Sequence, residues 1–164
     1  MTAYKSLPVN DVVAANSFCR ISPDDSGPQF SLAERAHVFQ PLFRLFSFNT
    51  LWRWAELTPP QLARLAAERR AWVWRGDRAL LIAEDTVDDD TPPGAPSLFI
   101  NFAGAGRDDL VEFLRDARAL AFSIGRPSAR IAASVKDEVL TDALTTAGFE
   151  RAWEDSLCLY EVRQ

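Results

Sequence analysis

The sequence predicts a mixed α/β (α+β) fold in which helices flank a central sheet. The main observation is a strand-length apolar run at 97–103, followed by a glycine turn at 104–107 and a long helical pattern at 108–124. A further strand, a second helix and a last strand are expected at 128–135, 137–148 and 156–162. Because a strand–helix–strand unit forms a right-handed crossover, the strands around the long helix should be parallel.

The long helix is predicted from one apolar stripe at the helical period. The stripe consists of Leu110, Phe113, Leu114, Ala117, Ala121 and Ile124. Arg115, Asp116 and Arg118 are expected on the outward face, and Gly125 and Pro127 should end the helix. A helix of this length can cover the parallel pair of strands on one face of the sheet.

The N-terminal half should supply helices and antiparallel strands. We expect a strand at 3–7, a helix from Pro8 through Cys19, and a second helix after the capping box that begins at Ser31 and is interrupted at Pro41. A third helix should run from 59 to 70, before a hairpin of 71–75 and 78–85 with Gly76 and Asp77 as a two-residue turn. The resulting order, β-α-α-α-β-β-β-α-β-α-β, describes one domain spanning 1–164.

Composition narrows the classes of partner. The net charge of −5 argues against nucleic acid as a main partner and fits a basic or neutral substrate. Neither a signal peptide nor an apolar run of about 18 residues is present, so we expect no membrane partner and a cytoplasmic protein. Cys19 and Cys158 match no metal-site spacing and are expected to be buried free thiols, and the single His37 cannot build a metal site. No metal is therefore predicted.

The turn at 104–107 is the first candidate for chemistry. A strand that feeds a glycine turn into a helix leaves backbone N–H groups free at the helix start, where the helix dipole favours a phosphate or another anion. The alternative is that Gly104 and Gly106 only make a tight turn and that Asp108 caps the helix.

Two other stretches admit two interpretations each. The aromatic stretch 46–57 can pack in the core, or it can line an acceptor pocket or a dimer contact. The arginines at 64, 69 and 70 are typical of a solvated helix face, but they could also meet cofactor phosphates.

Residues 97–161 resemble the C-terminal half of the GCN5-related N-acetyltransferases. The resemblance lies in FINFAGAGRDDLVEFLRDARALAFSIG, then RIAASV, then LTDALTTAGF and LCLYE. Its most specific part is the pairing of Gly148-Phe149 with Tyr160-Glu161. It implies that two central strands splay apart and that acetyl-CoA lies in the gap, with its pyrophosphate on the helix start.

This resemblance also implies roles for individual residues. The edge of Asn101–Phe102 would pair with the pantetheine amides, and Glu84 and Tyr160 would be candidates for the general base and the general acid. The backbone that holds the pyrophosphate would come from Gly104, Ala105, Gly106, Arg107 and Asp108. The expected acceptor is a small-molecule or peptide amine.

Two alternatives remain at this point. Leu144 stands where the resemblance places a tyrosine acid, Asp137 stands at the usual asparagine, and the turn carries Asp108 and Asp109, whose carboxylates would repel a pyrophosphate. The chain could therefore be a catalytically inactive GNAT-like ligand-binding or protein-interaction module, with 46–57 as a partner surface and a possible homodimer contact. It could also be an unrelated α/β domain in which 104–107 is only a turn.

Overall fold

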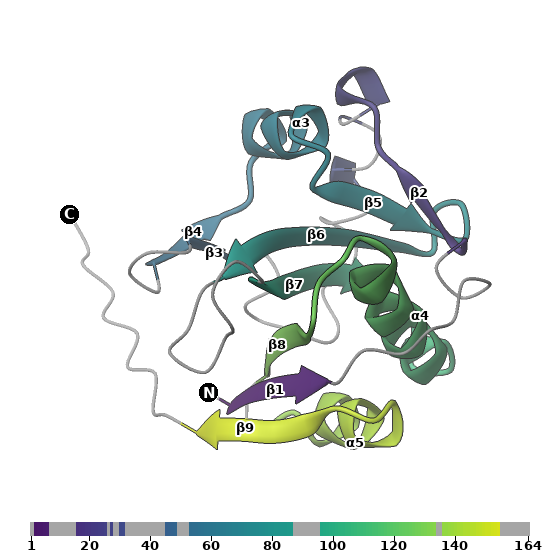
Figure 1. The fold of residues 1–164 in the computed structure, drawn as a ribbon. Coiled ribbons are helices and arrows are strands. Elements are labelled where there is room, and N and C mark those ends of the chain that lie inside the picture. Colours follow the sequence, from purple (N-terminus) through teal and green to yellow (C-terminus); the bar gives the residue numbers. More distant parts are fainter. Residues whose placement is uncertain are drawn as a thin grey trace.

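A seven-stranded mixed sheet flanked by helices confirms the predicted fold class (Figure 1). The computed structural model describes residues 2–6, 16–25, 27, 30–31, 45–48, 53–86, 96–133 and 136–154. The strand order is β2-β5-β6-β7-β8-β1-β9, and β3 and β4 form a separate two-stranded sheet. The strands are β1 (Thr2–Ser6), β2 (Phe18–Arg20), β3 (Leu45–Phe48), β4 (Arg53–Glu56), β5 (Ala71–Trp74), β6 (Ala79–Thr86), β7 (Ser97–Gly104), β8 (Ala129–Ala133) and β9 (Glu150–Glu154).

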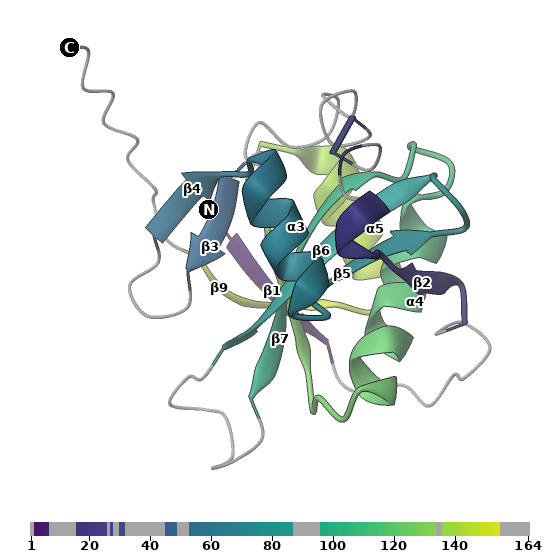
Figure 2. The ribbon, with the colours of Figure 1, turned by 90° about the horizontal axis from the view of Figure 1, so that it is seen from above.

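The helices lie on both faces of the sheet. They are η1 (Pro23–Asp25), α3 (Pro59–Ala67), α4 (Leu110–Ser123) and α5 (Glu138–Thr146). Alternate residues of β6 divide between two hydrophobic clusters: Leu81 packs with residues of α4 and α5, while Leu80 and Ile82 pack with residues of α3. Figures 1 and 2 show the same division, with α3 on one side of the sheet and α4 and α5 on the other.

The strands around α4 are parallel, as the sequence predicts. β6 and β7 pair along their whole length, from Ala79 opposite Gly104 to Thr86 opposite Ser97. By contrast, the parallel ladder of β7 and β8 contains three pairs and ends at Ile100 and Ile131. Within the described residues, the C-terminal half of β7 is therefore paired with β6 alone.

β1 fills the position between β8 and β9, antiparallel to both (Figure 1). The last described strand, β9, ends at Glu154, ahead of the strand predicted at 156–162, which lies outside the described residues. Most of the two helices expected between Pro8 and Phe46 also lies outside them. Within the described residues, Cys19 belongs to strand β2 and Phe46 to strand β3 rather than to a helix.

Three local predictions need correction. Helix α4 begins at Leu110 with Asp109 as its N-cap, so Asp108 does not cap it. The hairpin turn contains four residues, 75–78, since Trp74 pairs with Ala79. Asp116 is buried rather than outward-facing, because its carboxylate accepts a hydrogen bond from the Trp74 indole at 2.7 Å.

The predicted ends of α4 and α5 are confirmed, whereas α3, predicted to run to 70, ends at Ala67. Gly125 follows α4 with φ of 75°, and Gly148 follows α5 with φ of 84°. After α5, the N–H of Phe149 donates to the carbonyl of Leu144 at 2.9 Å and the N–H of Gly148 donates to Thr145 at 3.0 Å. This is the hydrogen-bond pattern of a glycine C-cap, and it directs Phe149 into the core.

Candidate functional site

The two glycines of the 104–107 turn differ in whether the fold requires them. Gly104 has φ of 88°, and a Cβ there would lie 2.5 Å from the carbonyl oxygen of Arg78 and 2.9 Å from the Cα of Ala79. The fold therefore demands glycine at the end of β7. Gly106 is exposed, and a Cβ there would meet no atom within 4 Å. Its missing side chain leaves the backbone of the turn open.

The backbone donors of the turn are partly engaged. The N–H of Ala105 donates to Arg78 at 3.0 Å, and the N–H of Asp109 donates to Gly106 at 2.8 Å. In the described part of the chain, the N–H groups of Gly106, Arg107 and Asp108 make no hydrogen bond. Of the sequence-predicted cradle of residues 104–108, Ala105 is therefore already engaged, and the donors at 106–108 lie just ahead of helix α4.

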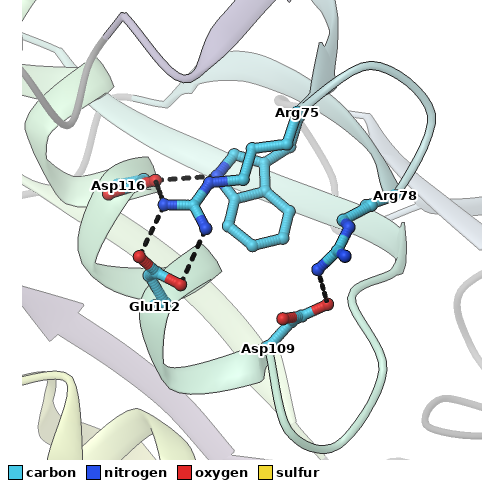
Figure 3. Close-up of polar contacts among 6 residues, drawn as sticks. Arg75, Arg78, Asp109, Glu112 and Asp116 are labelled. Carbon is cyan, nitrogen blue, oxygen red and sulfur yellow. Dashed lines mark hydrogen bonds and ion pairs between the residues drawn. The ribbon is translucent and has the colours of Figure 1, made fainter.

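Two arginines of the β5–β6 turn bind carboxylates at the start of α4 (Figure 3). The guanidinium of Arg75 donates to both oxygens of Glu112, at 2.8 and 2.5 Å, and lies 4.6 Å from the ring centre of Trp74. Arg78 donates to Asp109 at 2.8 Å. The negative charge of Asp109 is therefore compensated, while Asp108 and Arg107 are exposed beside it. These pairs also fix the hairpin turn against the helix.

Beyond the end of the β7–β8 ladder, the buried Phe102 has no strand partner on the β8 side among the described strands. Leu98 donates its N–H to Ser128 at 2.9 Å, and since backbone groups alternate along a strand, residues 98, 100 and 102 direct theirs toward β8. The ladder ends at Ile100, so Phe102 directs its N–H and C=O across the gap. Asn101 directs its backbone toward Ile82 of β6 instead. Of the predicted Asn101–Phe102 edge, only Phe102 is placed to pair with a ligand backbone.

Three buried polar side chains share the sheet face that α3 covers. Glu84 lies opposite Phe99, which is in register with Arg130 of β8, and Asn101 follows two residues along β7. The exposed fractions of Glu84, Asn101 and Arg130 are 8%, 7% and 5%. In the described part of the chain, Glu84 Oε2 and Asn101 Nδ2 have no hydrogen-bond partner. This group, called the polar sheet face below, adjoins the end of the β7–β8 ladder.

Burial makes the carboxyl group of Glu84 a weaker acid than an ordinary glutamate. Loss of hydration raises its pKa from 4.5 to about 7, and the positive charges of Arg70 and Arg64 counter only part of that effect. The nearer contact is between Arg70 Nη1 and Glu84 Oε1 at 3.8 Å. A carboxyl group with such a pKa exists in both protonation states near neutral pH, which is the property a general base needs.

Other sequence-predicted residues fall in different places. Arg70 lies beside Glu84, on the sheet face opposite α4, so the arginine cluster after α3 does not serve the turn at 104–107. Leu144 is fully buried in the core, and Asp137 caps α5 by accepting a hydrogen bond from the N–H of Leu140 at 3.0 Å. Cys19 is exposed, contrary to the prediction of a buried thiol. Tyr160, His37 and Cys158 lie outside the described residues.

Sequence reasoning missed the arginines of the hairpin turn and the side chains of Asn101 and Arg130. The register of β6 and β7, which brings residue 79 opposite residue 104, could have indicated that Arg75 and Arg78 lie near the helix start. A charged residue inside the apolar run 129–133 is a signal for Arg130.

The described residues contain neither a candidate metal site nor a candidate membrane span. No group of three histidine, cysteine or acidic side chains there could hold a metal ion. Likewise, none of the helices in that part of the chain combines the length and the apolar character that crossing a membrane requires.

Comparisons with known proteins identify the fold but no family. No protein-family model and no curated protein matches this sequence. Crystal structures of TTHA1254 from Thermus thermophilus are similar to it. The wild-type protein gives a TM-score of 0.55 at 14% identity, over 90% of this chain and 98% of that chain. A point mutant gives 0.55 at 13%, over 90% and 97%. At this identity, the similarity establishes a shared fold alone.

Proposed function

We propose that this protein is a GCN5-related N-acetyltransferase-like enzyme that transfers an acetyl group from acetyl-CoA to an amine. The observation that carries the proposal is Glu84, a buried carboxyl group with a pKa of about 7 and a free oxygen, beside the place where β7 and β8 stop pairing. A base with these properties is suited to take a proton from an amine at neutral pH.

The residues around the gap fit acetyl-CoA in two respects. The free N–H groups of 106–108 at the start of α4 suit the pyrophosphate, and the outward backbone of Phe102 suits the amides of the pantetheine arm. Glu84 lies opposite Phe99, five residues before Gly104, which is about 17 Å of strand. An extended pantetheine arm covers a span of this order. The phosphate-binding turn and the base Glu84 would then lie at opposite ends of the bound co-substrate.

In this proposal Glu84 performs the proton transfer. Acetyl-CoA supplies an acyl group activated as a thioester. As the acceptor nitrogen forms its bond to the acyl carbon and the C–S bond breaks, Glu84 Oε2 takes one proton from the nitrogen, and one proton ends on the CoA thiol. Tyr160 remains the predicted donor of that last proton. The acceptor, a small-molecule or peptide amine, the cytoplasmic location and a possible homodimer likewise stay predictions.

One observation favours the alternative of a catalytically inactive module. Leu144 stands where the resemblance places the acid, and it is fully buried in the core between α5 and the sheet. A leucine side chain has no acidic proton to give to a leaving thiolate. The alternative keeps the fold and a ligand site but removes the transfer step.

Calorimetric titration with acetyl-CoA and with free CoA tests the proposal. We expect micromolar binding that weakens as salt concentration rises, because phosphates dominate the contact. Gly106→Asp should weaken binding at least tenfold, since it adds a negative charge beside the three free N–H groups, in open space.

Gly27→Asp is the matched control. A Cβ at Gly27 would also meet no atom within 4 Å, and this glycine lies outside the turn, so the same added charge should leave affinity unchanged. Absence of binding by the wild-type protein up to millimolar concentration would overturn the proposal. Binding without transfer to any amine in an acceptor screen would favour the inactive module.

A further inference from the structure

Two unpartnered polar atoms of opposite character lie on the polar sheet face. Glu84 Oε2 is an acceptor when the carboxyl group is ionised, and Asn101 Nδ2 is a donor. Both residues are more than nine-tenths buried, and neither atom has a hydrogen-bond partner in the described part of the chain.

The strand register makes the two side chains diagonal neighbours. Glu84 is directly opposite Phe99, and Asn101 is two residues further along β7, so their backbones are about 7 Å apart on one face. They are close enough to contact the same small group, yet they do not bond each other. A ligand that lies between the two side chains can satisfy both.

Such groups are costly to leave unsatisfied. A buried donor without an acceptor destabilises the folded protein, and native structures hold few of them. Where they persist, a ligand that supplies the missing partner is a physical reason for keeping them. The pair here fits a ligand that presents an N–H on one side and a carbonyl oxygen on the other, which describes an amine beside an acyl group.

We propose that Asn101 Nδ2 donates a hydrogen bond to the carbonyl oxygen of the acyl group while Glu84 faces the acceptor nitrogen. This inference rests on the proposed function and deepens it, since it assigns the group that recognises the acyl carbonyl. Negative charge develops on that oxygen as the nitrogen adds to the carbon, so a donor fixed there stabilises the transition state more than the bound substrate.

The test compares the affinities of acetyl-CoA and free CoA for the wild-type protein and Asn101→Leu. Only acetyl-CoA carries the carbonyl, so we expect wild type to bind it about fivefold more tightly than CoA, and Asn101→Leu to lose that preference at unchanged CoA affinity. The melting temperature should not fall, because leucine removes a buried unsatisfied group. Asn101→Ala, which cannot overpack the site, should lose the same preference.

Ser128→Ala is the matched control at another buried polar site. Its hydroxyl lies 2.6 Å from that of Ser97 and is already partnered, so the preference for acetyl-CoA should persist. If wild type binds both ligands and both Asn101 variants keep the preference, the assignment of Asn101 is wrong and the proposed function stands. If the variants lose CoA affinity or melt at much lower temperature, Asn101 is a structural residue and the assignment is also wrong. If wild type binds neither ligand, the proposed function itself fails.

Discussion

Glu84 shows how one buried side chain links stability to chemistry. Burial removes water from its carboxylate and so destabilises the charged form. The positive charge of Arg70, 3.8 Å away, offsets only part of that effect. Because the folded-state pKa of about 7 lies above the ordinary 4.5, the folded protein binds more protons than the unfolded chain between these values. This group therefore destabilises the fold as pH rises through that window, and its cost is complete above pH 7.

We predict that Glu84→Gln separates the two effects. Between pH 5 and pH 8 the melting temperature of wild type should fall relative to that of the variant, because glutamine does not ionise. Acetyl transfer by wild type should rise with pH around a midpoint near 7, while the variant should lose about 10²-fold or more in rate and the pH dependence with it. Thermal unfolding and pH–rate profiles measure both.

Asp142→Asn is the control, since Asp142 is an exposed carboxylate on α5. It should change neither profile. A Glu84→Gln variant with wild-type activity and an unshifted pH profile would exclude Glu84 as the base.

At the scale of elements, the junction of β7 and α4 combines a fold requirement at Gly104 with the proposed phosphate-binding backbone at 106–108. Gly104 is needed because its backbone approaches Arg78 and Ala79 of β6, whereas nothing in the fold requires glycine at 106. The paired charges of Arg75 with Glu112 and Arg78 with Asp109 hold the turn in place from the hairpin side. The donors at 106–108 are left to face outward.

We predict opposite outcomes for two alanine substitutions in this turn. Gly104→Ala should lower the free energy of unfolding by about 2 kcal/mol or more, because alanine disfavours the positive φ and its Cβ would strike the Arg78 carbonyl. Gly106→Ala should stay within about 0.5 kcal/mol of wild type, since it has open space and no positive φ. Urea unfolding of both variants measures this. Equal losses at the two positions would contradict the structure of the turn.

At the scale of the whole molecule, the position of β1 depends on contacts with residues far away in the sequence. The first described strand of the chain lies between β8 and β9, so the sheet closes only when the N-terminus meets the C-terminal half. β1 pairs with β8 from Thr2 to Ser6 and with β9 from Thr2 to Lys5, with a register shift between Ala3 and Tyr4. β2, by contrast, stands at the end of the strand order, with β5 as its one neighbour among the described strands.

We predict that proline discriminates between these two strands. Lys5→Pro should lower the free energy of unfolding by about 2 kcal/mol or more. Because β1 has a neighbouring strand on each side, the N–H that proline lacks faces a strand whichever way it points. Arg20→Pro should cost less than about 1 kcal/mol. The N–H of Ile21 faces β5, donating to Ala71, so that of Arg20 faces outward. Urea unfolding gives both values, and a tolerated Lys5→Pro would exclude an interior position for β1.

The sequence predicts residues 97–148 well because its signals there are local, whereas β9 at Glu150–Glu154 was not predicted. The apolar stripe of α4, the terminating Gly125 and Gly148 and the strand-length run at 97–103 each depend on neighbours a few residues away. Prediction failed where a distant partner decides. Asp116 reads as an outward residue of its helix, but the indole of Trp74, 42 residues earlier, holds it inside.

The amino-acid sequence by itself determined the fold class, the parallel pair around α4 and the turn at 104–107, since periodicity and turn chemistry fix these locally. Only the tertiary structure decided which groups of that region can act. It placed Glu84 and Asn101 as neighbours on one sheet face, left Phe102 beyond the end of the ladder, and paired the carboxylate of Asp109 with Arg78. These relations depend on strand register, which is set by the packing of residues far apart in the chain.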